Sequence, residues 1–137
     1  MERLQFNLNE ELKKYKPLDS DELKNLELTK EFIKSNNNLF SRSNLVGHIN
    51  GSGFLMNDDL SQILLTHHKI LNKWLQFGGH SDGDENTLNV AMRETFEESG
   101  ISNFHPIRIN GSYIVDVAVN DIPENEKKKE PAHKHYD

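Results

Sequence analysis

The sequence predicts an α/β sandwich preceded by an N-terminal helical extension. Three observations predict it: helical spacing of apolar residues before residue 43, strand-like apolar runs after it, and one amphipathic helix among those strands. The chain has 137 residues, which is enough for a single domain. We therefore expect a helical extension over residues 1–42 and an α/β domain over residues 43–137.

The helical extension over residues 1–42 is polar, with leucines at every fourth position from Leu4 to Leu12. Asp19 and Glu22 have the spacing of a capping box in front of a second, more clearly amphipathic helix. Such helices bury their apolar stripe against another surface. The sequence allows two packing surfaces for this extension: the α/β domain of the same chain, or a second subunit in a homodimer.

The strands and the remaining helix follow in order along residues 43–137. Apolar runs, alternation of apolar and polar residues, and flanking glycine, asparagine or aspartate favour the strands. We expect the strand over 62–67 to be buried. The expected strands cover residues 45–56, with a bend that glycine permits, and 62–67, 73–77, 107–109 and 113–119. A helix is expected over 87–99 and a charged loop over 121–131.

The composition argues against several classes of protein. A net charge of −6 argues against a surface that coats nucleic acid. The absence of cysteine excludes disulfides and thiolate zinc sites. The first residues lack the apolar core of a signal peptide, and no run of about 18 apolar residues is long enough to span a membrane. We therefore expect a cytoplasmic protein that binds neither nucleic acid nor membranes.

Three glutamates share one face of the helix expected over 87–99. Glu94, Glu97 and Glu98, called the glutamate triad below, are spaced i, i+3 and i+4. Like charges at this spacing repel, and a divalent cation would neutralise them. Carboxylate oxygens are hard ligands, which suit Mg²⁺ and allow Mn²⁺ to substitute. The alternative is a solvated acidic helix face, the commoner meaning of this spacing when it occurs alone.

The residues around the glutamate triad form a longer pattern. From Gly79 to Ile101 the sequence follows G-x5-E-x7-R-E-x-x-E-E-x-G-I. This pattern resembles the Nudix box, the signature of enzymes that hydrolyse a diphosphate linked to another group, and every fixed position matches. The soft departure is Thr95, which stands where the family has a bulky apolar residue and whose methyl group can still pack. The resemblance implies a mixed central sheet between helices.

The Nudix resemblance assigns roles to individual residues. It implies that the glutamate triad and the backbone carbonyl of Gly78 bind the metal ion. Arg93 would orient the glutamates, and Glu85 would anchor the loop before the helix, often through an ion pair with Arg93. The alternative is an ordinary surface ion pair, which contributes little. Water activated by the metal would attack phosphorus and cleave the diphosphate of a nucleoside diphosphate linked to another moiety, as a pyrophosphatase does, giving a nucleoside monophosphate and the phosphorylated moiety.

Three further residues are candidates for binding the small-molecule diphosphate substrate. Gly79 lets the backbone approach a phosphate closely, because it has no side chain. His80 follows the glycines directly and is placed to contact a phosphate. Trp74 could stack on a base, although packing in the core is the favoured role for this side chain.

The resemblance extends beyond the box to one bacterial group of Nudix hydrolases. Residues 73–80 and 130–137 carry it, with Phe77 where that group usually has proline. In that group the chain continues through a further strand and a helix, so we expect this chain to lack roughly 40 to 60 residues at its C-terminal end. A downstream general base would then fall beyond Asp137.

Histidines alternate with other residues near the end of the chain. His133, His135 and Asp137 would share one face of a strand, which is a spacing suited to metal ligands. The favoured alternative is that these polar residues line the substrate cleft or pair with a neighbouring strand.

Three other functions stay open. A Nudix-like binding module holds an ADP-ribose or nucleotide-type ligand without cleaving it, but such modules commonly lose box glutamates, and this chain keeps them all. The isopentenyl diphosphate isomerase branch shares the fold but uses a cysteine, which is absent here. The third possibility is an inert fragment of an active enzyme. The sequence therefore favours a metal-dependent hydrolase.

Overall fold

The computed structural model describes residues 2–137 and places three helices and eight strands in them. The helices are α1 (Leu8–Lys14), α2 (Ser20–Ser35) and α3 (Thr87–Ser99). The strands are β1 (Gly47–Gly53), β2 (Leu55–Met56), β3 (Ile63–Leu64), β4 (Thr66–His68), β5 (Lys73–Leu75), β6 (Phe77–His80), β7 (Val119–Ile122) and β8 (His133–Tyr136). None of the described helices is both long and apolar enough to cross a membrane.

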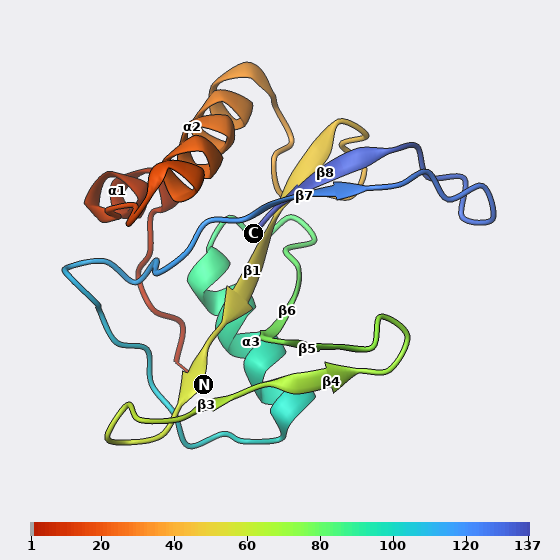
Figure 1. The fold of residues 1–137 in the computed structure, drawn as a ribbon. Helices are drawn as coiled ribbons and strands as arrows, with labels where there is room; N and C mark the ends of the chain where they lie inside the picture. The colour runs from red at the N-terminus through yellow and green to blue at the C-terminus, as the bar shows by residue number, and fades with distance from the viewer. Residues whose placement is uncertain (1) are drawn as a thin grey trace.

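Four strands form the central sheet in the order β6-β1-β8-β7. β1 pairs antiparallel with β6 and parallel with β8, and β7 pairs antiparallel with β8. The sheet is therefore mixed, as expected from the sequence. Two small two-stranded sheets, β2 with β3 and β4 with β5, lie outside it, and the β4–β5 hairpin projects past α3 (Figure 1).

The helices pack at the two ends of β1 (Figure 1). Near its start, Phe32 of α2 stacks on Tyr136 of β8 with ring centroids 4.2 Å apart, and Ile49 joins the same buried cluster. A second buried cluster joins Leu12 of α1 to Val117. The extension thus packs on the α/β part of its own chain, where burying these side chains contributes to stability. Near the end of β1, α3 packs across β1 and β6.

The bounds of α3 follow from its sequence and agree with the expected helix over 87–99. The side chain of Asn86 accepts a hydrogen bond from the amide of Asn89 and caps the first turn. Gly100 has a φ of 74°, and its N–H donates to the carbonyl of Phe96. Glycine enters this left-handed conformation without steric cost, so the helix ends here.

The expected buried strand over 62–67 is wrong. β3 and β4 divide this run, and Ile63 and Leu64 are 43% and 44% exposed. Both strands belong to the small sheets rather than to the central one. A short apolar run does not distinguish a core strand from an exposed hairpin, which explains the error.

The expected strands over 107–109 and 113–119 are also wrong, except that Val119 begins β7. Asn110 and Gly111 both have positive φ and turn the chain within a bridge between Ile109 and Ser112. Past the turn, the Tyr113 amide donates to a carboxylate oxygen of Glu11 rather than to a strand. Val117 packs on the extension, whereas Val115 is 42% exposed, so the alternating valines do not share one buried face.

The carboxylate of Glu11 ties this segment to α1. Its side chain is 5% exposed and lies 2.9 Å from Nη1 of Arg108, and it also accepts from the Tyr113 amide at 3.1 Å. Burial alone would raise the pKa of Glu11. The Tyr113 amide, Arg108 and Lys14 outweigh that effect, so the pKa of this carboxyl is lowered.

We expect Glu11→Gln to lower the free energy of unfolding at pH 7 by about 1–3 kcal/mol, because a buried charged acceptor is lost. The folded pKa lies below the unfolded one, so the stabilisation is present above the unfolded pKa and is lost as the pH falls through the folded value. Urea unfolding at a series of pH values between neutral and acid tests this. Glu10→Gln, in an exposed pair with Lys13, is the matched control with little effect; equal effects of the two would contradict the assignment.

Candidate active site

The first residue of the glutamate triad lies against β6. If Gly79 carried a Cβ, that atom would lie 2.6 Å from Cδ of Glu94, so only glycine leaves room for the carboxylate. Nη2 of Arg93 donates to Oε1 of Glu94 at 3.1 Å and to the carbonyl of His80 at 3.0 Å. Arg93 thereby joins α3 to β6 and holds the Glu94 carboxylate beside the backbone of the strand.

The other two glutamates lie further out on the same helix. Glu97 and Glu98 are exposed. Desolvation raises the pKa of the Glu98 carboxyl, and the charges of Glu94 and Glu97 add to this, while the Gly78 amide opposes it. In residues 2–137 the three carboxylates do not converge within 4.8 Å of one another. Repulsion between like charges at i, i+3 and i+4 favours such separated rotamers.

Residues other than Glu85 anchor the loop before α3. Within the described residues, Glu85 forms no ion pair with Arg93, so the expected pairing is wrong; Glu85 is exposed and Arg93 binds Glu94 instead. Two aspartates of the loop take this role. Asp82 accepts from Arg42 at 2.8 and 2.9 Å, and Asp84 accepts from Arg3 at 2.9 and 3.2 Å. The partner arginine lowers the pKa of each aspartate.

Trp74 lies away from any core. It is 67% exposed in β5, where its ring is 5.0 Å from that of His67. The favoured expectation of core packing is therefore wrong, because the β4–β5 hairpin leaves this side chain in solvent. Stacking on a base stays a prediction.

The His80 side chain points away from the glutamate triad. In the β1–β6 pairing, His80 lies opposite Asn50 and Gly79 lies opposite Gly51. Side chains alternate along a strand, so the His80 ring and the Glu94 contact at Gly79 lie on opposite faces of the sheet. The structure does not bring His80 to the carboxylates.

Four histidines meet on that opposite face. The ring of His48 lies 4.6 Å from that of His135 and 5.2 Å from those of His133 and His80, between centroids. Burial lowers the pKa of His135 to about 4, with His48, His80 and His133 adding to the shift. No pattern in the sequence marks His48 as part of this cluster, because only the parallel pairing of β1 with β8 sets it opposite His135.

Asp137 does not join the histidines. Its carboxylate accepts from Oγ of Ser52 at 2.7 Å and from Nε2 of Gln76 at 3.4 Å. Burial raises the pKa of this carboxyl, and the two hydrogen bonds oppose the shift. The expected alternation of His133, His135 and Asp137 on one face holds, but a three-residue ligand set that includes Asp137 is wrong.

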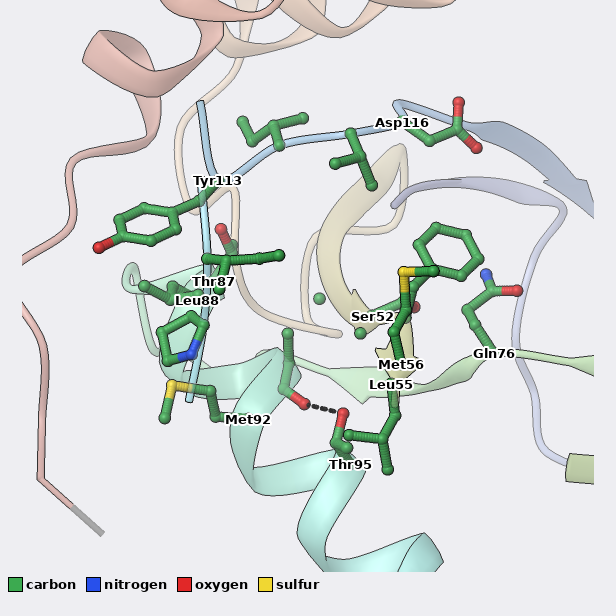
Figure 2. Close-up of a pocket in the computed structure, with 18 of the residues that line it drawn as sticks. Ser52, Leu55, Met56, Gln76, Thr87, Leu88, Met92, Thr95, Tyr113 and Asp116 are labelled. Atoms are coloured by element: carbon green, nitrogen blue, oxygen red, sulfur yellow. Dashed lines mark hydrogen bonds between the residues drawn. The ribbon is translucent and has the colours of Figure 1, made fainter. Parts of the chain in front are cut away.

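A large cavity of about 910 Å³ borders the apolar side of α3 and the Asp137 carboxylate. Figure 2 shows Leu88, Met92 and Thr95 of α3 on one side of it, with Tyr113 from the segment before β7 across from them. Thr95 is 4% exposed, and its hydroxyl donates to the Ala91 carbonyl at 2.7 Å. This bond satisfies the hydroxyl, so a threonine serves at a position expected to be apolar.

Within residues 2–137, the glutamate triad does not line this cavity; the cavity meets β6 through Ser52 at Gly78, on the face opposite the Glu94 contact. Ser52 lines the cavity and pairs with Gly78 in the β1–β6 register. A Cβ on Gly78 would lie 2.0 Å from Oγ of Ser52, so the serine side chain rests on the glycine backbone. The cavity therefore reaches the strand that carries the backbone next to Glu94 and Glu98.

Comparison with known families defines the class of protein. A family model for the NUDIX domain matches residues 48–135, which is more than half of the chain. The chain belongs to the Nudix family. No curated protein matches it. The expected family is thus confirmed, while the resemblance to one bacterial group stays a prediction.

Proposed function

We propose that this protein is a divalent-metal-dependent hydrolase that cleaves a nucleoside diphosphate linked to another moiety. The observation that carries the proposal is the contact between α3 and β6: Glu94 lies on Gly79, and Arg93 bonds both Glu94 and the His80 carbonyl. A carboxylate oxygen of the helix and the His80 carbonyl oxygen of the strand therefore share one donor, Nη2 of Arg93. Membership of the Nudix family supports the same class of reaction.

The donor set suits Mg²⁺, with Mn²⁺ as a substitute, because it consists of hard oxygen ligands. Glu94, Glu97, Glu98 and the carbonyl of Gly78 would hold the ion. When bound, the ion would supply charge neutralisation for the diphosphate and a bound water of lowered pKa. Exposed Glu97 and Glu98 are free to change rotamer toward Glu94, which Arg93 already holds in place.

The residues of the chain divide the remaining tasks. Gly79 leaves room for the Glu94 carboxylate against the strand backbone, and Gly78 leaves room for the Ser52 hydroxyl on the other face. The adjoining cavity of about 910 Å³ is large enough for a nucleoside or for the linked moiety. Its apolar wall on α3 would bind a ring or an aliphatic group, and the Ser52–Asp137 pair would bind a polar one.

A substrate screen tests the proposal. The protein would be incubated with dinucleotide polyphosphates, nucleotide sugars, ADP-ribose or nucleoside triphosphates, and released phosphate or nucleotide monophosphate would be measured with Mg²⁺, with Mn²⁺ and with chelator. We expect hydrolysis of at least one class that requires metal. Tight binding of ADP-ribose or a nucleotide without any cleavage would instead support the binding module.

A further inference from the structure

We propose that His48, His133 and His135, called the histidine cluster below, form a second metal site that takes Zn²⁺. One ring nitrogen from each residue lies within 4.8 Å of the others. The cluster contains no residue of the glutamate triad and lies on the other face of the sheet. The inference therefore stands apart from the proposed hydrolase function.

The buried ring of His48 points to a missing ligand. This side chain is 3% exposed, and neither ring nitrogen has a hydrogen-bond partner among residues 2–137. A buried polar group without a partner costs free energy, commonly about 1–3 kcal/mol. Folded proteins rarely leave such groups unpaired. A metal ion that accepts the lone pair of a His48 ring nitrogen would satisfy this side chain.

The hydrogen bond from His133 to the backbone sets its tautomer. Nδ1 of His133 lies 2.8 Å from the carbonyl of Pro131, which can only accept, so Nδ1 carries the proton. Nε2 of His133 then presents a lone pair, which accepts a hydrogen bond from Nε2 of His135 at 3.1 Å. A histidine that ligates a metal is held in this way, with its other nitrogen donating to a carbonyl.

The spacing of these two nitrogens suits one tetrahedral ion. Two nitrogens at the usual zinc distance of about 2.0–2.1 Å lie about 3.3 Å apart in tetrahedral geometry. A bound ion would replace the hydrogen bond between His133 and His135. With its proton moved from Nε2 to Nδ1, His135 would present a second lone pair to the same point, and the ring would stay neutral. A set of three imidazoles suits Zn²⁺ and disfavours Mg²⁺, which prefers oxygen.

The surroundings leave a fourth position open. The histidine cluster lines a cavity of about 600 Å³ together with His80 and three glutamates of the loop before β8, Glu124, Glu126 and Glu130. The His80 ring lies 5.1 Å from that of His135. His80, a loop carboxylate or water can complete the coordination. Because His48 is in β1 and the other two are in β8, the ion would join the two parallel strands at their paired residues.

Zinc titration of the metal-free full chain tests the site. A chromophoric chelator in competition would report affinity and stoichiometry, and Co²⁺ would report tetrahedral nitrogen coordination through its visible absorption. We expect one Zn²⁺ per chain at this site. At about 100 times Kd, zinc should raise Tm by on the order of 5–10 °C.

Variants place the bound ion. His133→Gln and His135→Gln, both at half-buried positions, should each weaken Zn²⁺ binding by about 10–100-fold. His105→Gln, at an exposed histidine outside the cluster, should bind Zn²⁺ as the unaltered chain does. Unchanged affinity in both cluster variants would overturn the inference.

Glu98→Gln separates this site from the proposed active site. It should leave the zinc affinity, the Co²⁺ spectrum and the zinc-dependent rise in Tm unchanged. If Glu98→Gln removed zinc binding and His135→Gln did not, the ion would belong to the glutamates and the histidine site would be rejected, without effect on the hydrolase proposal.

Discussion

Replacing Glu98 by glutamine is expected to lower kcat by on the order of 100-fold or more, since loss of a charged metal ligand removes several kcal/mol of transition-state stabilisation. Glutamine keeps the shape of the side chain but lacks the charge. The carboxyl is exposed on α3 and has no salt bridge within the described residues, so the fold should not depend on it. Steady-state kinetics on the best substrate of the screen, with Mn²⁺ affinity measured by electron paramagnetic resonance, would give the effect.

Glu27→Gln provides the matched control for this change. Glu27 is exposed on α2, so the substitution removes the same charge at a distance from the site, and kcat and Mn²⁺ affinity should stay as in the unaltered protein. Equal urea midpoints for both variants would exclude a folding effect. Turnover that survives Glu98→Gln unchanged would remove Glu98 from the metal site and with it the proposed role of the glutamate triad.

The sequence is sufficient to predict a structural element whose bounds depend on residues close together in the chain. Asn86 at one end and Gly100 at the other determine the bounds of α3 through interactions within a few residues. The apolar and acidic faces of the same helix follow from the spacing of its residues, because residues three and four apart lie on one face of an α-helix. The approach of a phosphate to Gly79 stays a prediction, whereas the contact that the structure shows at this glycine, with the Glu94 carboxylate, was not expected.

Interactions between distant segments could not be predicted. The arginines that pair with Asp82 and Asp84 come from the N-terminal part of the chain, and charge alone does not select them from 16 basic residues. His48 meets His135 only because β1 and β8 pair in parallel. The exposure of Trp74 likewise depends on where its hairpin projects, since an aromatic residue between apolar neighbours looks the same in a core strand.

Gly79→Ala should impair the proposed metal site while leaving the fold largely intact. Its methyl group would meet the Glu94 carboxylate at 2.6 Å, and that carboxylate is the far end of a flexible side chain. The side chain can therefore swing away, at the expense of its bond with Arg93. We expect kcat and Mn²⁺ affinity to fall by about 10–100-fold, the range for residues that position a ligand, with little change in Tm.

Gly51→Ala is the informative comparison, because the same substitution there meets backbone. Its Cβ would lie 2.7 Å from the carbonyl oxygen of Thr87 at the start of α3, which cannot rotate aside. The helix itself must shift, and we expect unfolding to become easier by about 1–3 kcal/mol. Loss of stability in Gly51→Ala and loss of activity in Gly79→Ala would show that β1 positions α3, whereas β6 positions its carboxylate. If Gly79→Ala kept full turnover and Mn²⁺ affinity, the contact between Glu94 and β6 would have no part in catalysis.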